Sequence, residues 1–255
     1  MLRIQRINPL NDILDKKFVA FVGAGGKTSL IEYLAAGAAK QGKRVALTTT
    51  TKIFVKEPYI LTEKTCLHSG PGMPSYLRIG RSLENGKLTG ITFDEIDILG
   101  ELFDLVLIEA DGSKRLPLKY PAEYEPVIPP RSESIYVIAG LDSLYGTVRE
   151  KVFRRELFCD RTGISPDAVI GPDLFLRFFS RDALLKDVDE QRCTIVLNKF
   201  DAPASRGEAL KLAGALLKVM PAREVITSCI PFGIFYKMQI SSVFNNLPRA
   251  VSHEP

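Results

Sequence analysis

Residues 18–30, which read FVAFVGAGGKTSL, constrain the fold of this chain more than any other stretch. Residues 18–22 form a short apolar run typical of a buried parallel strand. A glycine-rich turn follows, then Lys27 and Thr28, and then an apolar-periodic helix from Leu30. Strand, glycine loop, Lys-Thr and helix predict a phosphate-binding loop, because glycines let backbone N–H groups turn toward an anion and the helix N-terminus adds its positive dipole.

The glycine loop is a variant of the usual G-x-x-x-x-G-K-[ST] pattern, which would require glycine where this chain has Phe21. The shorter G-x-x-G-K-T predicts a tighter loop, as in the ATP loops of Mur-type ligases. We expect Lys27 to reach the β- and γ-phosphates and to act in catalysis, and the Thr28 hydroxyl to ligate Mg²⁺. The alternative is a glycine-rich turn that only begins a helix. The predicted nucleotide-binding residues are Gly23, Ala24, Gly25, Gly26, Lys27, Thr28 and Ser29.

An acid pair follows a second apolar run, residues 105–108, and consists of Glu109 and Asp111. In P-loop folds, a carboxylate at the end of a neighbouring strand holds Mg²⁺. Ligands also collect at the carboxyl ends of parallel strands. We therefore predict that one acid binds Mg²⁺ while the other orients water or a substrate hydroxyl, and the sequence leaves their roles interchangeable. A polar turn ending a strand is the alternative.

The sequence Asn198-Lys199-Phe200-Asp201 follows a third apolar run and matches N-K-x-D, the guanine-reading motif of P-loop GTPases. The Asp201 carboxylate could accept from guanine N1–H and the exocyclic amine, a donor pair that adenine does not offer. Lys199 would pack over the base, and Asn198 would pin the loop and approach the base edge. GTP is therefore favoured over ATP, with a polar strand-to-helix loop as the alternative.

Two further segments carry polar groups suited to an anionic substrate or a γ-phosphate. The first is Thr49, Thr50, Thr51 and Lys52, whose threonines equally fit plain β-propensity. The second is Lys114 and Arg115, at the start of a long proline-rich stretch, residues 112–131, which we expect to lie as a loop over the carboxyl edge of the sheet. Its cations could bind a phosphorylated partner or could simply be solvated.

Alternating strands and helices predict an α/β fold with a mostly parallel sheet and helices on both faces, the three-layer arrangement of P-loop NTPases. Asn85-Gly86 predicts a β-hairpin inserted near residues 76–92. We expect residues 1–255 to form a single domain. Further predicted strands are 45–48, 105–108, 135–139, 194–197 and 225–227, and predicted helices are 27–41, 94–102, 150–161, 172–186 and 204–219.

Composition excludes several other classes of protein. The net charge of +4 is too small to indicate nucleic-acid binding, and no apolar run approaches the length of a membrane helix. The N-terminal segment lacks the pattern of a signal peptide, and the four cysteines form no C-x-x-C pair. We therefore expect a cytoplasmic protein that contacts neither nucleic acid nor membrane. Oligomeric state cannot be read from the sequence.

The motifs VGAGGKTSL, TTTTKI, EADGSKRLPLKYPAEYEPVIP and LNKFD, in this order and spacing, resemble those of the YqeC-like family. The resemblance runs from about residue 18 to about residue 230 and is most specific in the third motif. It implies a P-loop NTPase that serves as an accessory protein of selenium-dependent molybdenum hydroxylases. The implied partner is a selenium- and molybdenum-containing enzyme or a precursor of its cofactor.

Three functional classes fit these motifs. The first is a maturation factor that hydrolyses GTP or ATP with Mg²⁺. The second is a phosphoryl or nucleotidyl transferase, or a Mur-like ATP-dependent ligase, acting on a small-molecule precursor. The third is a nucleotide-gated binding protein with little turnover. Whether the chain is an enzyme, hydrolysing or transferring, is therefore left open, although hydrolysis is favoured.

Overall fold

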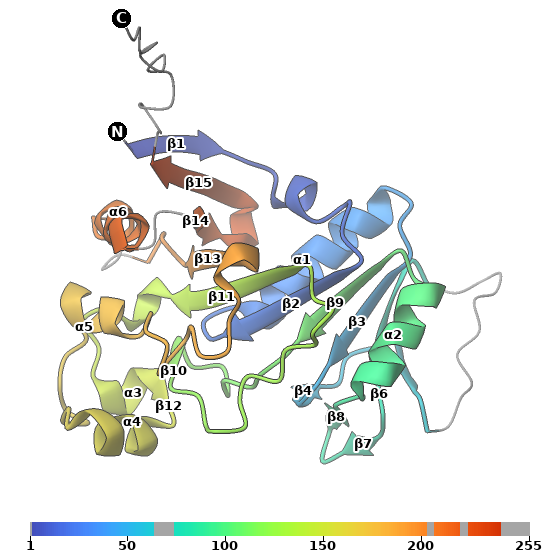
Figure 1. Cartoon of the computed structure of the whole chain (residues 1–255), viewed down its shortest axis with the longest axis horizontal. Coiled ribbons are helices and arrows are strands. Elements are labelled where there is room, and N and C mark those ends of the chain that lie inside the picture. Colours follow the sequence, from blue (N-terminus) through green and yellow to red (C-terminus); the bar gives the residue numbers. More distant parts are fainter. Residues whose placement is uncertain (1, 64–73, 203–206, 220–223, 241–255) are drawn as a thin grey trace, which may run out of the picture.

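A large mixed sheet dominates the computed structural model, which describes residues 2–63, 74–202, 207–219 and 224–240 (Figure 1). In spatial order the strands of this sheet are β1 (Leu2–Arg6), β15 (Ile234–Ile240), β14 (Glu224–Cys229), β13 (Cys193–Asn198), β11 (Ser134–Gly140), β2 (Phe18–Gly23), β9 (Leu105–Glu109), β3 (Val45–Thr49), β6 (Tyr76–Gly80) and β5 (Tyr59–Leu61). All neighbouring strands from β14 to β5 are parallel, and in this sheet only the described pairs that involve β15 are antiparallel. The carboxyl ends of the parallel strands therefore meet at one edge.

Strand β2 lies near the middle of this sheet, buried along its whole length between β9 and β11. Its side chains alternate between the two faces, as strand geometry requires. Val19 and Phe21 pack with the helix α1 (Lys27–Lys40), whereas Ala20 and Val22 pack on the opposite face. The central placement of β2 puts the glycine loop at the centre of the carboxyl edge.

Helices cover both faces of the sheet (Figure 1). On one face, α1 buries a stripe at helical spacing that includes Leu30, Leu34 and Ala38. On the other face lie α2 (Phe93–Leu102) and α6 (Ala209–Val219). This arrangement confirms the predicted α/β class with a mostly parallel sheet and helices on both sides.

The hairpin at Asn85-Gly86 is present but shorter than predicted. Strands β7 (Leu83–Glu84) and β8 (Lys87–Thr89) form it, and both turn residues have positive φ, as a type I′ turn requires. A third strand, β4 (Lys52–Phe54), pairs with β8. Residues 76–80 do not belong to the hairpin, because they form β6 in the main sheet.

Most of the predicted regular elements are found, and two helices are not continuous. The segment 150–161 is interrupted by β12 (Val152–Phe153), which pairs with β10 (Leu118–Lys119) in the proline-rich stretch and separates α3 (Val148–Lys151) from α4 (Arg155–Thr162). The segment 172–186 is helical only in α5 (Pro172–Arg177), and the residues beyond it, which include the buried Phe178 and Leu184, lie in turns and bends. The first residues of the predicted helix 204–219 lie outside the described residues. Short 3-10 turns complete the fold: η1 (Pro9–Asp12), η2 (Leu141–Ser143), η3 (Glu190–Arg192) and η4 (Ile230–Phe232).

Within the described residues, no helix combines the length and apolarity needed to cross a membrane. Three cysteines are described, Cys159, Cys193 and Cys229, and all are free thiols. Cys66 lies outside the described residues.

Candidate functional site

The glycine loop, residues 23–26, is shaped by close approaches that only glycine permits. Gly23, Gly25 and Gly26 all have positive φ. A Cβ on Gly25 would lie 2.2 Å from the backbone nitrogen of Gly140, and one on Gly26 would lie 2.3 Å from Nδ2 of Asn198. The loop is therefore pressed against the ends of β11 and β13, and its sequence is dictated by packing as well as by turn geometry.

The loop ends at α1, whose first residue is Lys27. Gly26 is the N-cap of α1, and no side chain of the described residues accepts a hydrogen bond from the first N–H groups of this helix. The positive end of the helix dipole is therefore not compensated by a side chain. Such a terminus is a favourable place for an anion.

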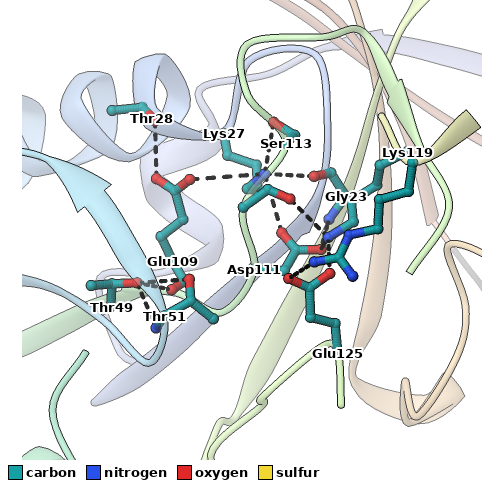
Figure 2. Close-up of polar contacts among 12 residues, drawn as sticks. Gly23, Lys27, Thr28, Thr49, Thr51, Glu109, Asp111, Ser113, Lys119 and Glu125 are labelled. Carbon is teal, nitrogen blue, oxygen red and sulfur yellow. Dashed lines mark hydrogen bonds and ion pairs between the residues drawn. The ribbon is translucent and has the colours of Figure 1, made fainter. Parts of the chain in front are cut away.

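Figure 2 shows that Lys27 lies at the centre of a polar cluster. Its amine donates to the backbone oxygen of Gly23 and to Ser113 Oγ at 3.3 Å. The same Nζ is 3.1 Å from Asp111 Oδ1 and 3.8 Å from Glu109 Oε1. Only 2% of Lys27 is exposed, and a buried ammonium needs such partners to remain charged. We refer to Lys27, Thr28, Glu109, Asp111 and Ser113 as the lysine cluster.

Glu109 is the last residue of β9 and lies on the same face as Leu105 and Leu107, beneath α1. Its Oε2 accepts a hydrogen bond from Thr28 Oγ1 at 2.9 Å (Figure 2). Burial raises the pKa of Glu109 above its ordinary value, and the opposing effects of Lys27 and the Thr28 hydroxyl do not cancel this rise. The hydroxyl of the exposed Thr28 and the carboxylate of the buried Glu109 therefore meet beside the helix N-terminus.

Asp111 holds the cluster together from the opposite side. Its Oδ2 accepts from the N–H of Gly23 at 2.9 Å and lies 3.0 Å from the amine of Lys119. Lys119 is buried and also contacts Glu125 Oε2 at 2.8 Å, and Glu125 in turn pairs with Arg154 at 3.0 Å. A continuous line of alternating charges thus leads from the glycine loop into the proline-rich stretch.

The residues Thr49 to Lys52 divide into two groups. Thr49 Oγ1 donates to the backbone oxygen of Glu109 at 2.7 Å, and Thr51 lies beside it (Figure 2). Thr50 donates instead to the backbone oxygen of Val127. Lys52 is not brought to the cluster, because its amine pairs with Glu84 of the hairpin at 2.6 Å. The threonines thus border the site and tie it to the proline-rich stretch.

The predicted cations of the proline-rich stretch, Lys114 and Arg115, are exposed and lie directly after Ser113. Both have positive φ, and their charged groups lie over the rings of Phe153 and Phe54, respectively. They are neighbours of the lysine cluster and do not belong to it.

The N-K-x-D residues lie at the carboxyl ends of β13 and the loop after it. Asn198 Nδ2 donates to the backbone oxygen of Gly25 at 2.8 Å, and its Oδ1 accepts from Ser228 Oγ at 2.9 Å. Lys199 pairs with Asp142 at 2.7 Å. Burial, followed by the hydrogen bond to Asp201, raises the pKa of the Cys229 thiol to about 11. Asn198 therefore ties the glycine loop to the ends of β13 and β14.

The oxygen donors of Thr28 and Glu109 fit Mg²⁺, which binds through one or two protein oxygens together with phosphate oxygens and water. The described residues include no group of three or more His, Cys, Asp or Glu that could hold a metal without such help. The buried charges also balance: Lys27, Lys119 and Arg154 face Glu109, Asp111 and Glu125. A bound polyphosphate would upset this balance unless it arrived with a cation.

Several residues of the site carry no signal in the sequence. Lys119 ends the two-residue strand β10, whereas Glu125 and Arg154 lie in irregular chain, and charged residues at such places are ordinarily solvated. Asp142 comes shortly after β11, whose end meets the glycine loop. Its place after a strand end is therefore the signal in the sequence that could have identified it. Ser113 is the exception, since it directly follows the acid pair.

Comparison with known proteins places these residues within a family. A family model described as YqeC protein matches residues 19–156, a span that holds the entire lysine cluster and ends before the N-K-x-D motif. The uncharacterized protein YqeC of Escherichia coli (strain K12) is 38% identical over 161 residues, covering 60% of this chain and 63% of the relative. The match therefore spans less than two thirds of that relative's length.

Proposed function

Because this chain belongs to the YqeC family, and the family match contains the whole lysine cluster, we propose that it binds a Mg²⁺–nucleoside triphosphate at the N-terminus of α1. The observation that carries the proposal is the convergence of a buried amine, a helix N-terminus without a side-chain cap, and a Thr28 hydroxyl on the Glu109 carboxylate. These are the groups that a P-loop supplies to a polyphosphate.

Each residue then has a definite task. Lys27 exchanges part of its contact with Gly23 and Asp111 for phosphate oxygens and neutralises charge on the transferring phosphoryl group. Thr28 and Glu109 would hold Mg²⁺, which would supply charge neutralisation to the phosphates. Asp111 stays with Gly23 and Lys119 and fixes the position of the loop. Glu109 is thus the metal-binding acid and Asp111 the positioning acid.

The base is guanine in this proposal, with adenine as the alternative. Support comes from the N-K-x-D order at the end of β13 and from Asn198, which ties this motif to the glycine loop. Asp201 would read the donor edge of guanine, and Lys199, held by Asp142, would cover the base.

At the level of pathway, we propose an NTPase that serves the maturation of a selenium- and molybdenum-containing hydroxylase or its cofactor in the cytoplasm. Only the family resemblance supports this role. A phosphoryl or nucleotidyl transferase, or a Mur-like ligase, is the second candidate, and the short glycine loop favours it.

The sharpest test replaces Thr28 rather than Lys27. Removing the buried Lys27 amine would leave Asp111 and Glu109 poorly compensated, so lost binding could reflect misfolding. Thr28→Val is nearly isosteric and removes only the hydroxyl on Glu109. We expect it to weaken nucleotide binding in Mg²⁺ by about tenfold or more and to leave the residual binding without Mg²⁺ unchanged, as measured by calorimetric titration.

Thr48→Val is the matched control. It makes the same Thr-to-Val change at a buried position, where the hydroxyl donates to Ile79 in β6 and faces away from the cluster. The control should bind Mg²⁺–nucleotide like the unaltered chain. If Thr28→Val also binds normally in Mg²⁺, the assigned metal site is wrong.

A further inference from the structure

The chain makes a strained turn immediately beside the lysine cluster. The N–H of Leu116 donates to the backbone oxygen of Ser113 at 3.0 Å and closes a four-residue turn. The two central residues, Lys114 and Arg115, have φ of 46° and 64°. Turns with positive φ at both central positions are dominated by Gly, Asn and Asp, because other L-residues are strained there.

The turn is held in this conformation from both sides. The backbone oxygen of Leu116 accepts from the N–H of Gly25 at 3.1 Å, and Ser113 Oγ accepts from Lys27. The buried Lys119 fixes the neighbouring backbone through the oxygen of Gly112 at 2.8 Å. None of these contacts uses the side chain of residue 114 or 115. Glycine at both positions would make the same turn with less strain, so turn geometry does not explain a lysine and an arginine here.

These side chains present positive charge that the described residues do not neutralise. Arg115 lies 4.7 Å from the ring centre of Phe54, and Lys114 lies 5.5 Å from that of Phe153. Neither cation forms an ion pair within the described part of the chain, in contrast to the balanced charges of the buried cluster. Lys87 of the hairpin lies 4.8 Å from the centre of the Phe54 ring, so a third cation shares an aromatic neighbour with Arg115.

We propose that Lys114 and Arg115 form a second anion subsite, which holds the phosphate group of a small-molecule second substrate beside the nucleotide. Two cations without counter-ions suit a phosphate dianion better than a monoanionic carboxylate, and the arginine fork can contact two phosphate oxygens at once. A strained backbone conformation persists at functional sites where it positions side chains that the function requires. The substrate class is therefore a phosphomonoester or a diphosphate. The subsite's role as an acceptor site rests on the proposed nucleotide site, whereas its affinity for phosphate does not.

The test uses inorganic phosphate as the probe and the double variant Lys114→Asn/Arg115→Gly. Phosphate is titrated by ³¹P NMR into the full chain, with and without a saturating non-hydrolysable GTP analogue and Mg²⁺. We expect the variant to bind phosphate at least about tenfold more weakly in the presence of the analogue. Its affinity for the analogue should be unchanged, and its Tm should rise by about 2 °C because the strain is relieved.

Lys40→Gln/Lys218→Gln is the control, since it removes the same charge from exposed positions on α1 and α6 that lie outside the turn. An equal loss of phosphate affinity in this control would overturn the proposal in favour of general electrostatics, as would unaltered affinity in the Lys114→Asn/Arg115→Gly variant. If the unaltered chain does not bind the GTP analogue but binds phosphate, and the Lys114→Asn/Arg115→Gly variant loses that phosphate affinity, the nucleotide proposal is wrong and the anion subsite is supported.

Discussion

At the scale of single residues, the carboxylate of Asp111 contacts three parts of the chain at once: the N–H of Gly23, the amine of Lys27 and the amine of Lys119. Glu109, two residues earlier, meets the hydroxyl of Thr28 instead. The two acids are equivalent in the sequence, and their different partners separate their roles. We infer that Asp111 organises the loop, which leaves Glu109 as the acid for the proposed Mg²⁺.

Substitution of Asp201 tests whether the bound nucleotide carries guanine or adenine. Asp201→Asn keeps the size of the side chain but replaces an acceptor oxygen with an amide that cannot accept from both guanine donors. We expect GTP affinity to fall about 10- to 100-fold, the value of one or two charge-assisted hydrogen bonds, and ATP affinity to change little. Competitive titration of both nucleotides measures the ratio.

Because Asp201 also hydrogen-bonds the thiol of Cys229, the control is Cys229→Ala, which removes that contact and keeps the carboxylate. The control should preserve the preference for GTP. Equal losses of GTP and ATP in Asp201→Asn would remove the guanine argument.

The sequence predicted the site residues that follow strands and missed Lys119, which reaches the site from the proline-rich stretch. Lys27, Thr28, Glu109 and Asp111 meet because parallel strands place their ends at one edge. Lys119 is buried by the pairing of β10 with β12, a contact that no local pattern encodes. The positive φ of Lys114 and Arg115 likewise contradicts local propensity, so only the structure could show it.

At the scale of elements, the glycine loop depends on close approach as well as on turn conformation. Gly25→Ala would bring a Cβ within 2.2 Å of the Gly140 nitrogen at a φ of +79°. We expect it to lower the free energy of unfolding by about 3 kcal/mol or more, the sum of a strained backbone and a forced shift of β11. Urea denaturation followed by circular dichroism measures the loss.

Gly42→Ala provides the comparison, because Gly42 has a similar φ of +83° but nothing within 4 Å of its Cβ position. Its cost should be about 1 kcal/mol, from backbone strain alone. Similar losses in the two variants would show that close packing does not shape the loop.

Helix α2 begins with a capping box, in which Glu95 accepts from the N–H of Thr92 at 2.7 Å. Burial alone would raise the pKa of Glu95, but hydrogen bonds from Arg81, Thr92 and Thr62 outweigh it and lower the pKa to about 2 from 4.5. Because the folded-state pKa is depressed, this stabilisation is present above about pH 4.5 and is lost as the pH falls toward 2. Glu95→Gln should therefore be less stable than the unaltered chain at pH 7, with the difference vanishing near pH 2.

Denaturation midpoints across this pH range measure the effect. Glu150→Gln is the control, since Glu150 closes the same type of box with Thr147 but is fully exposed and makes no ion pair in the described chain. Its pH-dependent difference should be smaller. A difference for Glu95→Gln that persists unchanged to pH 2 would refute the assigned contacts.

The helices and strands were largely predictable where the apolar residues follow one regular spacing or form one continuous run, as in β2, α1 and β9. Prediction failed where tertiary pairing overrides local preference. Val152 and Phe153 favour a strand by type and find a partner in β10, which splits a segment that otherwise resembles one helix. Past α5, buried residues such as Phe178 and Leu184 lie in turns and bends, so their burial follows tertiary packing and no helical period.

At the scale of the whole molecule, the sheet gathers four strand ends around one place: β2, β9, β11 and β13. The glycine loop follows β2, and Asp111, Gly140 and Asn198, which come from the ends of the other three strands, each contact it. An NTPase, a transferase and a nucleotide-gated binder could all be built on this edge. What separates them is whether turnover needs a second substrate, which the strained turn at Lys114 and Arg115 would hold.

The most direct measurement is calorimetric titration of GTP and of ATP into the full chain, each with and without Mg²⁺, followed by product analysis. Our account predicts a single site that binds GTP more tightly than ATP, with Mg²⁺ strengthening the binding. Slow phosphate release would then support an NTPase, and release that requires an added phosphorylated acceptor would support a transferase. Absence of binding for both nucleotides in Mg²⁺ would contradict the central claim that the lysine cluster is a nucleotide site.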